Sequence, residues 1–195
     1  MKVRYLAIAS CIGVTILMGA PPAMAANHEC VAGKSTAASY TWKFKAEANN
    51  IFQDIQFDAQ QARYHADRLQ TFARDGDMTW DSHADQLDEL KTEVNDMGAK
   101  LCRLETIRRV VAPWQQKEID RIASTLRLMA DSTQDAINFG NTHQRDLWLA
   151  SYRTYANNIF ADAQSLANSV DHAVEYARTS REYHELGHEM GSPSD

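Results

Sequence analysis

Apolar and small residues recur every three or four positions along four long stretches of the chain, which is the spacing of an amphipathic helix. The first stretch runs from about Ser39 to Arg74 and ends at a polar joint that contains Gly76. Ser82 and Asp85 have the spacing of a capping box, so we expect the next helix to begin there. The residues expected to face inward from the first helix are Ala48, Ile51, Phe52, Ile55, Ala59, Ala62, Ala66, Leu69 and Ala73.

The second stretch has the clearest pattern, because its apolar residues follow heptad steps that only Arg108 interrupts. Such a pattern is typical of a helix in a bundle or coiled coil. Pro113 either begins a third helix or kinks one continuous helix and leaves an extended hairpin. The heptad residues are Leu87, Leu90, Val94, Met97, Leu101, Leu104 and Val111.

The third and fourth stretches are separated by Gly140 and Asn141, which we expect to stop one helix and cap the next. The inward face of the third is expected to hold Ile119, Ile122, Leu126, Met129, Thr133 and Ala136 or Ile137. That of the fourth is expected to hold Trp148, Tyr152, Ala156, Ile159, Phe160, Ala163, Leu166, Ala167, Val170, Val174 and Ala177.

Four helices joined by short connections predict an all-α fold, an antiparallel up-down-up-down four-helix bundle over residues 39–186. The first and fourth helices are expected to be longer than the second and third, so that their ends overhang the compact part. An irregular segment, 26–38, precedes the bundle, and a flexible tail, 187–195, follows it. Gly98 lies in the middle of the second helix, where close approach of a neighbouring helix would explain a glycine.

The amino-acid composition fits an all-α fold and argues against binding to nucleic acid or to anionic lipid. Among 195 residues, 8 glycines and 4 prolines are too few for a turn-rich β fold. The 26 acidic and 20 basic side chains give a formal charge of −6, which offers no attraction to nucleic acid or to anionic lipid. Hydrophobic residues make up 44% of the chain, enough for a core in a soluble protein.

Residues 1–25 have the three parts of a secretory signal peptide, with Lys2 and Arg4 before an apolar run and the small-residue site of Ala23 to Ala25 after it. We expect cleavage near Ala25 and a periplasmic or secreted protein without a transmembrane segment, because the apolar run is too short to span a bilayer. Loss of the two basic residues takes the formal charge from −6 to −8. A lipoprotein acylated at Cys11 is the alternative.

After cleavage the chain keeps two cysteines, Cys30 and Cys102. In an oxidising compartment this pair is a disulfide candidate that would join the N-terminal segment to the second helix. Two free thiols with a buried Cys102 are the alternative.

The sharpest local motif, His184-Glu185-Leu186-Gly187-His188, resembles the HExxH helix of zincin metallopeptidases. The resemblance implies zinc ligands at His184 and His188 and a general base at Glu185. Ser194 stands where the related metzincins carry a third histidine. A solvated helix end, or an exposed histidine pair that binds metal without catalysis, are the other interpretations. No haem, di-iron, phosphate-loop or nucleophile-elbow motif is present in the sequence.

Two regularities suggest further hypotheses. The segment Ala48–Phe52 recurs as Ala156–Phe160, with Asp54 and Asp162 in the same register, so these helices either pack alike or share a polar site. One tryptophan lies near the start of each expected helix, where it would cap the core or form part of a ligand cage. These tryptophans are Trp42, Trp80, Trp114 and Trp148.

Three segments, Thr79–Ala84, Met97–Leu101 and Pro113–Gln116, resemble a loosely defined group of uncharacterised secreted bacterial helical proteins over roughly residues 40–180. The resemblance implies a helical bundle and export, and it assigns no site residues. We therefore expect a non-enzymatic binding, scaffold or stress-related interaction module that needs no cofactor. A protein partner or self-association is expected, and the alternative is a zinc-binding protein or zinc hydrolase built on His184, Glu185 and His188.

Overall fold

The computed structural model describes residues 41–190, with side chains from Lys43 to Leu186. The expected signal peptide, the irregular segment and Cys30 therefore lie outside the described residues. Helix α1 spans Thr41–Phe72, α2 spans Trp80–Ile107, α3 spans Pro113–Thr142 and α4 spans Ala150–Met190. A short 3-10 helix, η1, covers Arg108–Val110, and residues 41–190 contain no strand. The prediction of an all-α protein with four long helices is confirmed.

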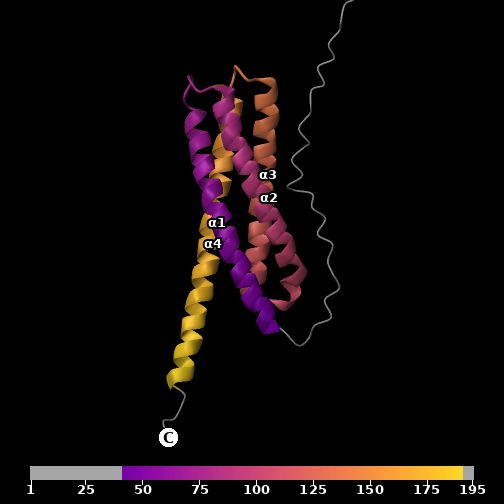
Figure 1. The fold of residues 1–195 in the computed structure, drawn as a ribbon, viewed down its shortest axis with the longest axis vertical. Coiled ribbons are helices and arrows are strands. Elements are labelled where there is room, and N and C mark those ends of the chain that lie inside the picture. The colour runs from indigo at the N-terminus through magenta and orange to yellow at the C-terminus, as the bar shows by residue number, and fades with distance from the viewer. Residues whose placement is uncertain (1–40, 191–195) are drawn as a thin grey trace, which may run out of the picture.

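The four helices pack around one core, as Figure 1 shows. Helix α1 packs against α2 and α4, and α3 packs against the same two helices, so each helix has two neighbours. The C-terminal part of α4 continues past the ends of the other helices (Figure 1). Within the described chain, no helix combines the length and apolar character needed to cross a membrane.

The core follows the predicted helical faces closely. Phe52, Leu90, Met129 and Ile159 are among the largest fully buried side chains, one from each helix. Small residues such as Ala59 on α1 and others on α4 are also fully buried, which lets helices approach closely. Trp148 is the exception to the predicted stripe, because 61% of it is exposed.

The joint at Pro113 separates two helices that pack against each other, so the alternative of one continuous kinked helix is wrong. Helix α2 ends at Ile107, and Ala112 takes an extended conformation (φ −64°, ψ 151°) directly before the proline. Proline then occupies the first turn of α3, where its missing N–H costs no helical hydrogen bond.

Several predicted helix ends are wrong. Helix α2 begins at Trp80, so Ser82 lies inside it; Thr79 is the N-cap residue, and its side chain makes no capping hydrogen bond. Helix α4 begins at Ala150 and continues to Met190, four residues into the segment expected as a tail. Asn141 lies inside α3, which ends at Thr142, so it neither stops α3 nor caps α4.

Gly140 does not stop α3; it makes room for a tryptophan. A Cβ atom at Gly140 would lie 2.0 Å from Cζ3 of Trp80, so only glycine leaves space for the indole ring of α2 against α3. No glycine in the described range has a positive φ, so this glycine is explained by close packing rather than by backbone conformation. Gly98 is buried on α2.

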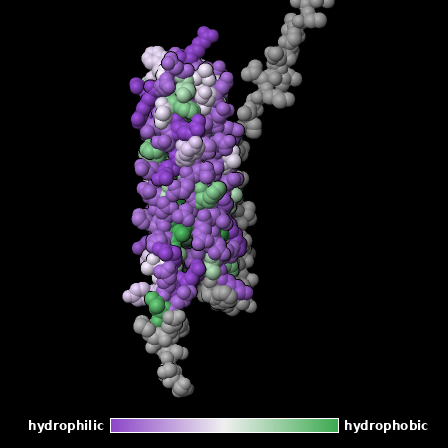
Figure 2. Space-filling model, turned by 60° about the vertical axis from the view of Figure 1, so that its left-hand side comes forward, coloured by the Kyte–Doolittle hydropathy of each residue, from purple (hydrophilic) through white to green (hydrophobic). Residues whose placement is uncertain are grey.

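Most of the surface in Figure 2 is hydrophilic, with hydrophobic residues as separate small spots on the face that is drawn. The large apolar side chains that are exposed in the described part of the chain are dispersed over it. Tyr183, which is 80% exposed, and Leu186 lie near the C-terminal end of α4.

Candidate functional site

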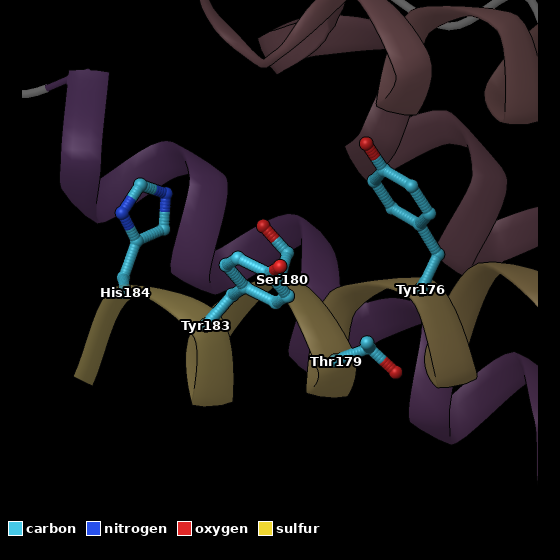
Figure 3. Close-up of a pocket in the computed structure, with 5 residues that line it drawn as sticks. All are labelled: Tyr176, Thr179, Ser180, Tyr183 and His184. Atoms are coloured by element: carbon cyan, nitrogen blue, oxygen red, sulfur yellow. The ribbon is translucent and has the colours of Figure 1, made fainter. Parts of the chain in front are cut away.

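A groove lies beside the C-terminal part of α4, where α1 and the beginning of α3 meet that helix. Its volume is about 330 Å³, and it is an open trough rather than an enclosed cavity. Tyr176, Ser180 and His184 project into it from successive turns of α4 (Figure 3). We call this site the α4 groove; its described lining residues are Lys45, Asn49, Ala112, Trp114, Gln115, Tyr176, Ala177, Ser180, Arg181 and His184.

A second hollow, of about 360 Å³, adjoins the α4 groove and shares Tyr176, Ser180 and His184 with it. Thr179 and Tyr183 complete its described lining (Figure 3). The two hollows together extend along two turns of α4, so a ligand longer than a single ring can contact both.

Gln115 fixes the floor of the groove by joining the start of α3 to α1. Its side-chain oxygen accepts a hydrogen bond from the backbone N–H of Ala112 (2.9 Å), at the start of α3. Its amide nitrogen donates to the backbone oxygen of Lys45 (2.9 Å) and to Oδ1 of Asn49 (2.8 Å), both on α1. Gln115 is 1% exposed, so these bonds satisfy a polar group that would be costly to bury alone.

This network also orients Asn49. Because Gln115 donates to Oδ1 of Asn49, the NH₂ group of Asn49 is left to donate elsewhere, an orientation assigned from the hydrogen bonds. Asn49 is half-buried and lines the groove, so a fixed donor lies in its wall.

Aromatic rings form the apolar side of the groove. Trp114 packs inward against the core residue Phe52, with ring centroids 6.1 Å apart. On its other side it contacts Tyr176 of α4, with centroids 4.8 Å apart and planes tilted by 60°. Tyr176 is 55% exposed and Tyr183 is 80% exposed, so their rings are open to a partner.

The charged side chains of the groove are basic. Lys45 and Arg181 line it, and neither forms an ion pair within the described part of the chain. None of the described lining residues is acidic. Arg178, one turn before Arg181, is different because it pairs with Glu175 at 2.6 Å and reaches Glu182 at 3.5 Å.

The HExxH motif lies at the end of α4, where His184 faces the groove and both His184 and Glu185 are exposed. The side chain of His188 lies outside the described residues. Among the side chains that the structure describes, no three His, Cys, Asp or Glu residues lie together as metal ligands. Zinc binding by His184 and His188 with Glu185 as a base thus stays a prediction, as does the disulfide between Cys30 and half-buried Cys102.

The repeated pentapeptides do not share a polar site, so that hypothesis is wrong. Gln60 of α1 donates to Asp171 of α4 (2.9 Å), and Gln70 donates to Asn157 (3.0 Å). Asn49 lines the groove with Ser180, so Asn49 and Asn157 lie near opposite ends of the α1–α4 contact. Each of the two asparagines accepts a hydrogen bond from a different glutamine.

Sequence reasoning missed a buried pair, His83 and Tyr152, in which Nδ1 of His83 lies 3.0 Å from the hydroxyl of Tyr152. The two residues are 1% and 0% exposed. Burial lowers the pKa of His83 to about 4 and raises the pKa of Tyr152, so both are neutral at pH 7. Phe72 and Phe139 pack around them, and we call these four residues the aromatic cluster.

Polar groups between α1 and α2 are satisfied within the bundle. Asp58, 6% exposed, pairs with Lys100, and burial nevertheless raises the pKa of the Asp58 carboxyl. Nδ1 of His65 lies 3.1 Å from the side-chain oxygen of Gln86, within hydrogen-bond distance. These two contacts connect α1 to α2.

Comparison with known proteins gives no further guidance, because no family model, curated protein or solved structure matches this chain.

Proposed function

We propose that this protein is an exported, non-enzymatic interaction module that binds a partner protein through the α4 groove. The observation that carries the proposal is the groove itself, in which exposed aromatic rings adjoin two cations that have no ion-pair partner within residues 41–190. Sites that recognise proteins commonly combine aromatic residues with arginine.

The role of the bundle in this proposal is to hold the groove rigid. Gln115 ties α3 to α1, and Trp114 connects the groove wall to the core through Phe52. A binding surface on packed helices loses less conformational entropy on association than one on a mobile loop.

The proposal includes an antiparallel up-down-up-down topology with longer first and last helices. Hydrogen bonds support opposite directions for α1 and α4, because partners of rising number on α1 have falling numbers on α4. The ring of contacts, in which each helix packs against two others, also supports it. The C-terminal part of α4, which lines the groove, continues past the ends of the other helices (Figure 1).

The test is affinity capture followed by direct titration of the captured partner with purified protein. The variant Tyr176→Ser/Tyr183→Ser removes one exposed ring from the groove and one from the adjoining hollow, so we expect capture and titrated binding to be lost. Phe57→Ser/Tyr64→Ser is the matched control, because it removes two rings of similar exposure (66% and 53%) from α1.

Equal binding by the groove variant and the control would overturn the proposal. So would the absence of any partner together with a monomeric wild-type protein by light scattering. A dimer that dissociates only in the groove variant would make the partner a second copy and support the groove as the binding surface.

A further inference from the structure

We propose that the α4 groove binds a short acidic peptide segment that carries an aromatic or large apolar side chain between its carboxylates. This inference rests on the proposed function and adds the chemistry of the partner.

The polar groups of the groove are mainly donors. Lys45 and Arg181 can only donate, and the NH₂ group of Asn49 is left to donate because Oδ1 is occupied by Gln115. The acceptor of Gln115 is itself used by Ala112. A ligand rich in acceptors therefore satisfies this wall, whereas a cationic ligand would meet two positive charges.

The positive charge of the groove favours a ligand with carboxylate side chains over one with neutral acceptors. Lys45 on α1 and Arg181 on α4 lie in the same groove without an acidic residue in its described lining. The chain as a whole is acidic, with a formal charge of −6, so this pair of cations stands out locally. Carboxylates of a partner would form ion pairs that the chain itself does not supply.

The aromatic side of the groove requires an apolar group next to those carboxylates. Trp114 and Tyr176 form a contact 4.8 Å between centroids, and the Tyr176 ring stays 55% exposed. An aromatic or large aliphatic side chain of the ligand would cover that exposed ring.

The shape favours a peptide over a compact small molecule. The two adjoining hollows follow α4 from Tyr176 to His184, a rise of about 12 Å for eight helical residues. An extended peptide covers that distance with about four residues, at roughly 3.3 Å each. Its backbone carbonyls would meet the hydroxyl group of Ser180, which lines both hollows (Figure 3).

The experiment is fluorescence anisotropy of the full-length protein with a short labelled peptide in which Phe stands between two Asp residues. We expect binding that weakens as salt is added, because exposed ion pairs are screened. A peptide with Asn in place of both Asp, and another with Ala in place of Phe, should each bind about tenfold more weakly. Equal binding of all three peptides, or of none, would overturn the inference.

Protein variants locate the site. Lys45→Gln/Arg181→Gln should weaken the acidic peptide about tenfold, whereas Arg63→Gln/Arg153→Gln should leave its binding unchanged. The control pair also takes one cation from α1 and one from α4, and both residues are exposed and outside the groove. Lys45→Glu/Arg181→Glu should instead bind a peptide with Lys in place of Asp, and failure of this charge exchange would contradict the assigned contacts.

The inference and the proposed function fail in different ways. If the captured partner needs Tyr176 and Tyr183 but the acidic peptide does not bind, the groove is the binding surface and its ligand chemistry is wrong. If the partner also binds the groove variant at full strength, the groove is not the binding surface and both are wrong.

Discussion

Aromatic residues lie near both ends of the bundle. At one end their contacts and hydrogen bonds come from the protein itself, whereas at the other end part of their surface stays exposed. In the aromatic cluster, His83 and Tyr152 are buried and hydrogen-bonded to each other. In the α4 groove, Tyr176 is half exposed, and Lys45 and Arg181 have no ion-pair partner within the described chain. The comparison indicates that the cluster stabilises the fold, whereas the groove has contacts to offer to another molecule.

The largest expected effect concerns His83. Its pKa is about 4 in the folded protein and about 6.5 when unfolded, so between these values the unfolded state binds more protons. We expect His83 to lower the free energy of unfolding by about 3 kcal/mol as the pH falls from 6.5 to 4, with no further loss below that. Urea unfolding at a series of pH values measures this dependence.

The control for this prediction is His83→Asn, which keeps a hydrogen-bonding group for Tyr152 but does not titrate. The carboxyls of buried Asp58 and partly buried Asp162 have raised pKa values and act in the opposite direction, because they bind protons more readily in the folded state. The difference between wild type and His83→Asn isolates the histidine. A parallel pH dependence in both proteins would contradict a neutral buried His83.

The second prediction concerns the close packing of Gly140 against Trp80, near the aromatic cluster. Gly140→Ala places a Cβ atom on the indole ring, so we expect the free energy of unfolding to fall by about 2 kcal/mol through overpacking. In the Trp80→Ala background the same substitution should be neutral or slightly stabilising, since alanine favours a helix over glycine. A double-mutant cycle with additive effects would show that the two residues do not press on each other.

The sequence predicts which positions of one helix are buried, but not which residues of different helices contact each other. The spacing along one helix predicts that Phe52 and Met129 are buried, because a helix places residues three and four apart on one face. It does not predict the role of Gly140, since the ring that needs the space lies 60 positions earlier, at Trp80. The apolar spacing also predicts an inward Trp148, which is wrong because α4 begins at Ala150, after this residue.

The sequence also does not predict that the residues of the α4 groove lie together. Trp114 and His184 were singled out separately from the sequence, but their spacing does not show that they line one hollow. The sequence does not predict the bonds of Gln115 to Lys45 and Asn49, because these partners come from another helix. The one local signal is that Gln115 lies three positions after Ala112, the residue before the helix start expected at Pro113, where a side chain can reach back to the backbone.

Gln115 is buried, like His83 and Tyr152 of the aromatic cluster, but it forms the floor of the open α4 groove. We expect Gln115→Ala to lower the free energy of unfolding by about 1.5 kcal/mol, since three hydrogen bonds are lost at a buried position. Thermal unfolding measures the loss. Gln115→Glu keeps the acceptor for Ala112 but buries a carboxylate against the oxygens of Lys45 and Asn49, so it should be at least as destabilising as Gln115→Ala. A variant as stable as wild type would contradict the network.

The smallest expected effect is on the groove cations. Lys45→Gln/Arg181→Gln should change the free energy of unfolding by less than about 0.5 kcal/mol, because both side chains are exposed and form no ion pair within the described chain. Arg63→Gln/Arg153→Gln is the matched control in the same urea titration. If only the groove pair were destabilising, its cations would be satisfied by the protein itself, and the contrast between a closed cluster and an open groove would not hold. An unchanged stability together with lost peptide binding would instead assign these two charges to recognition.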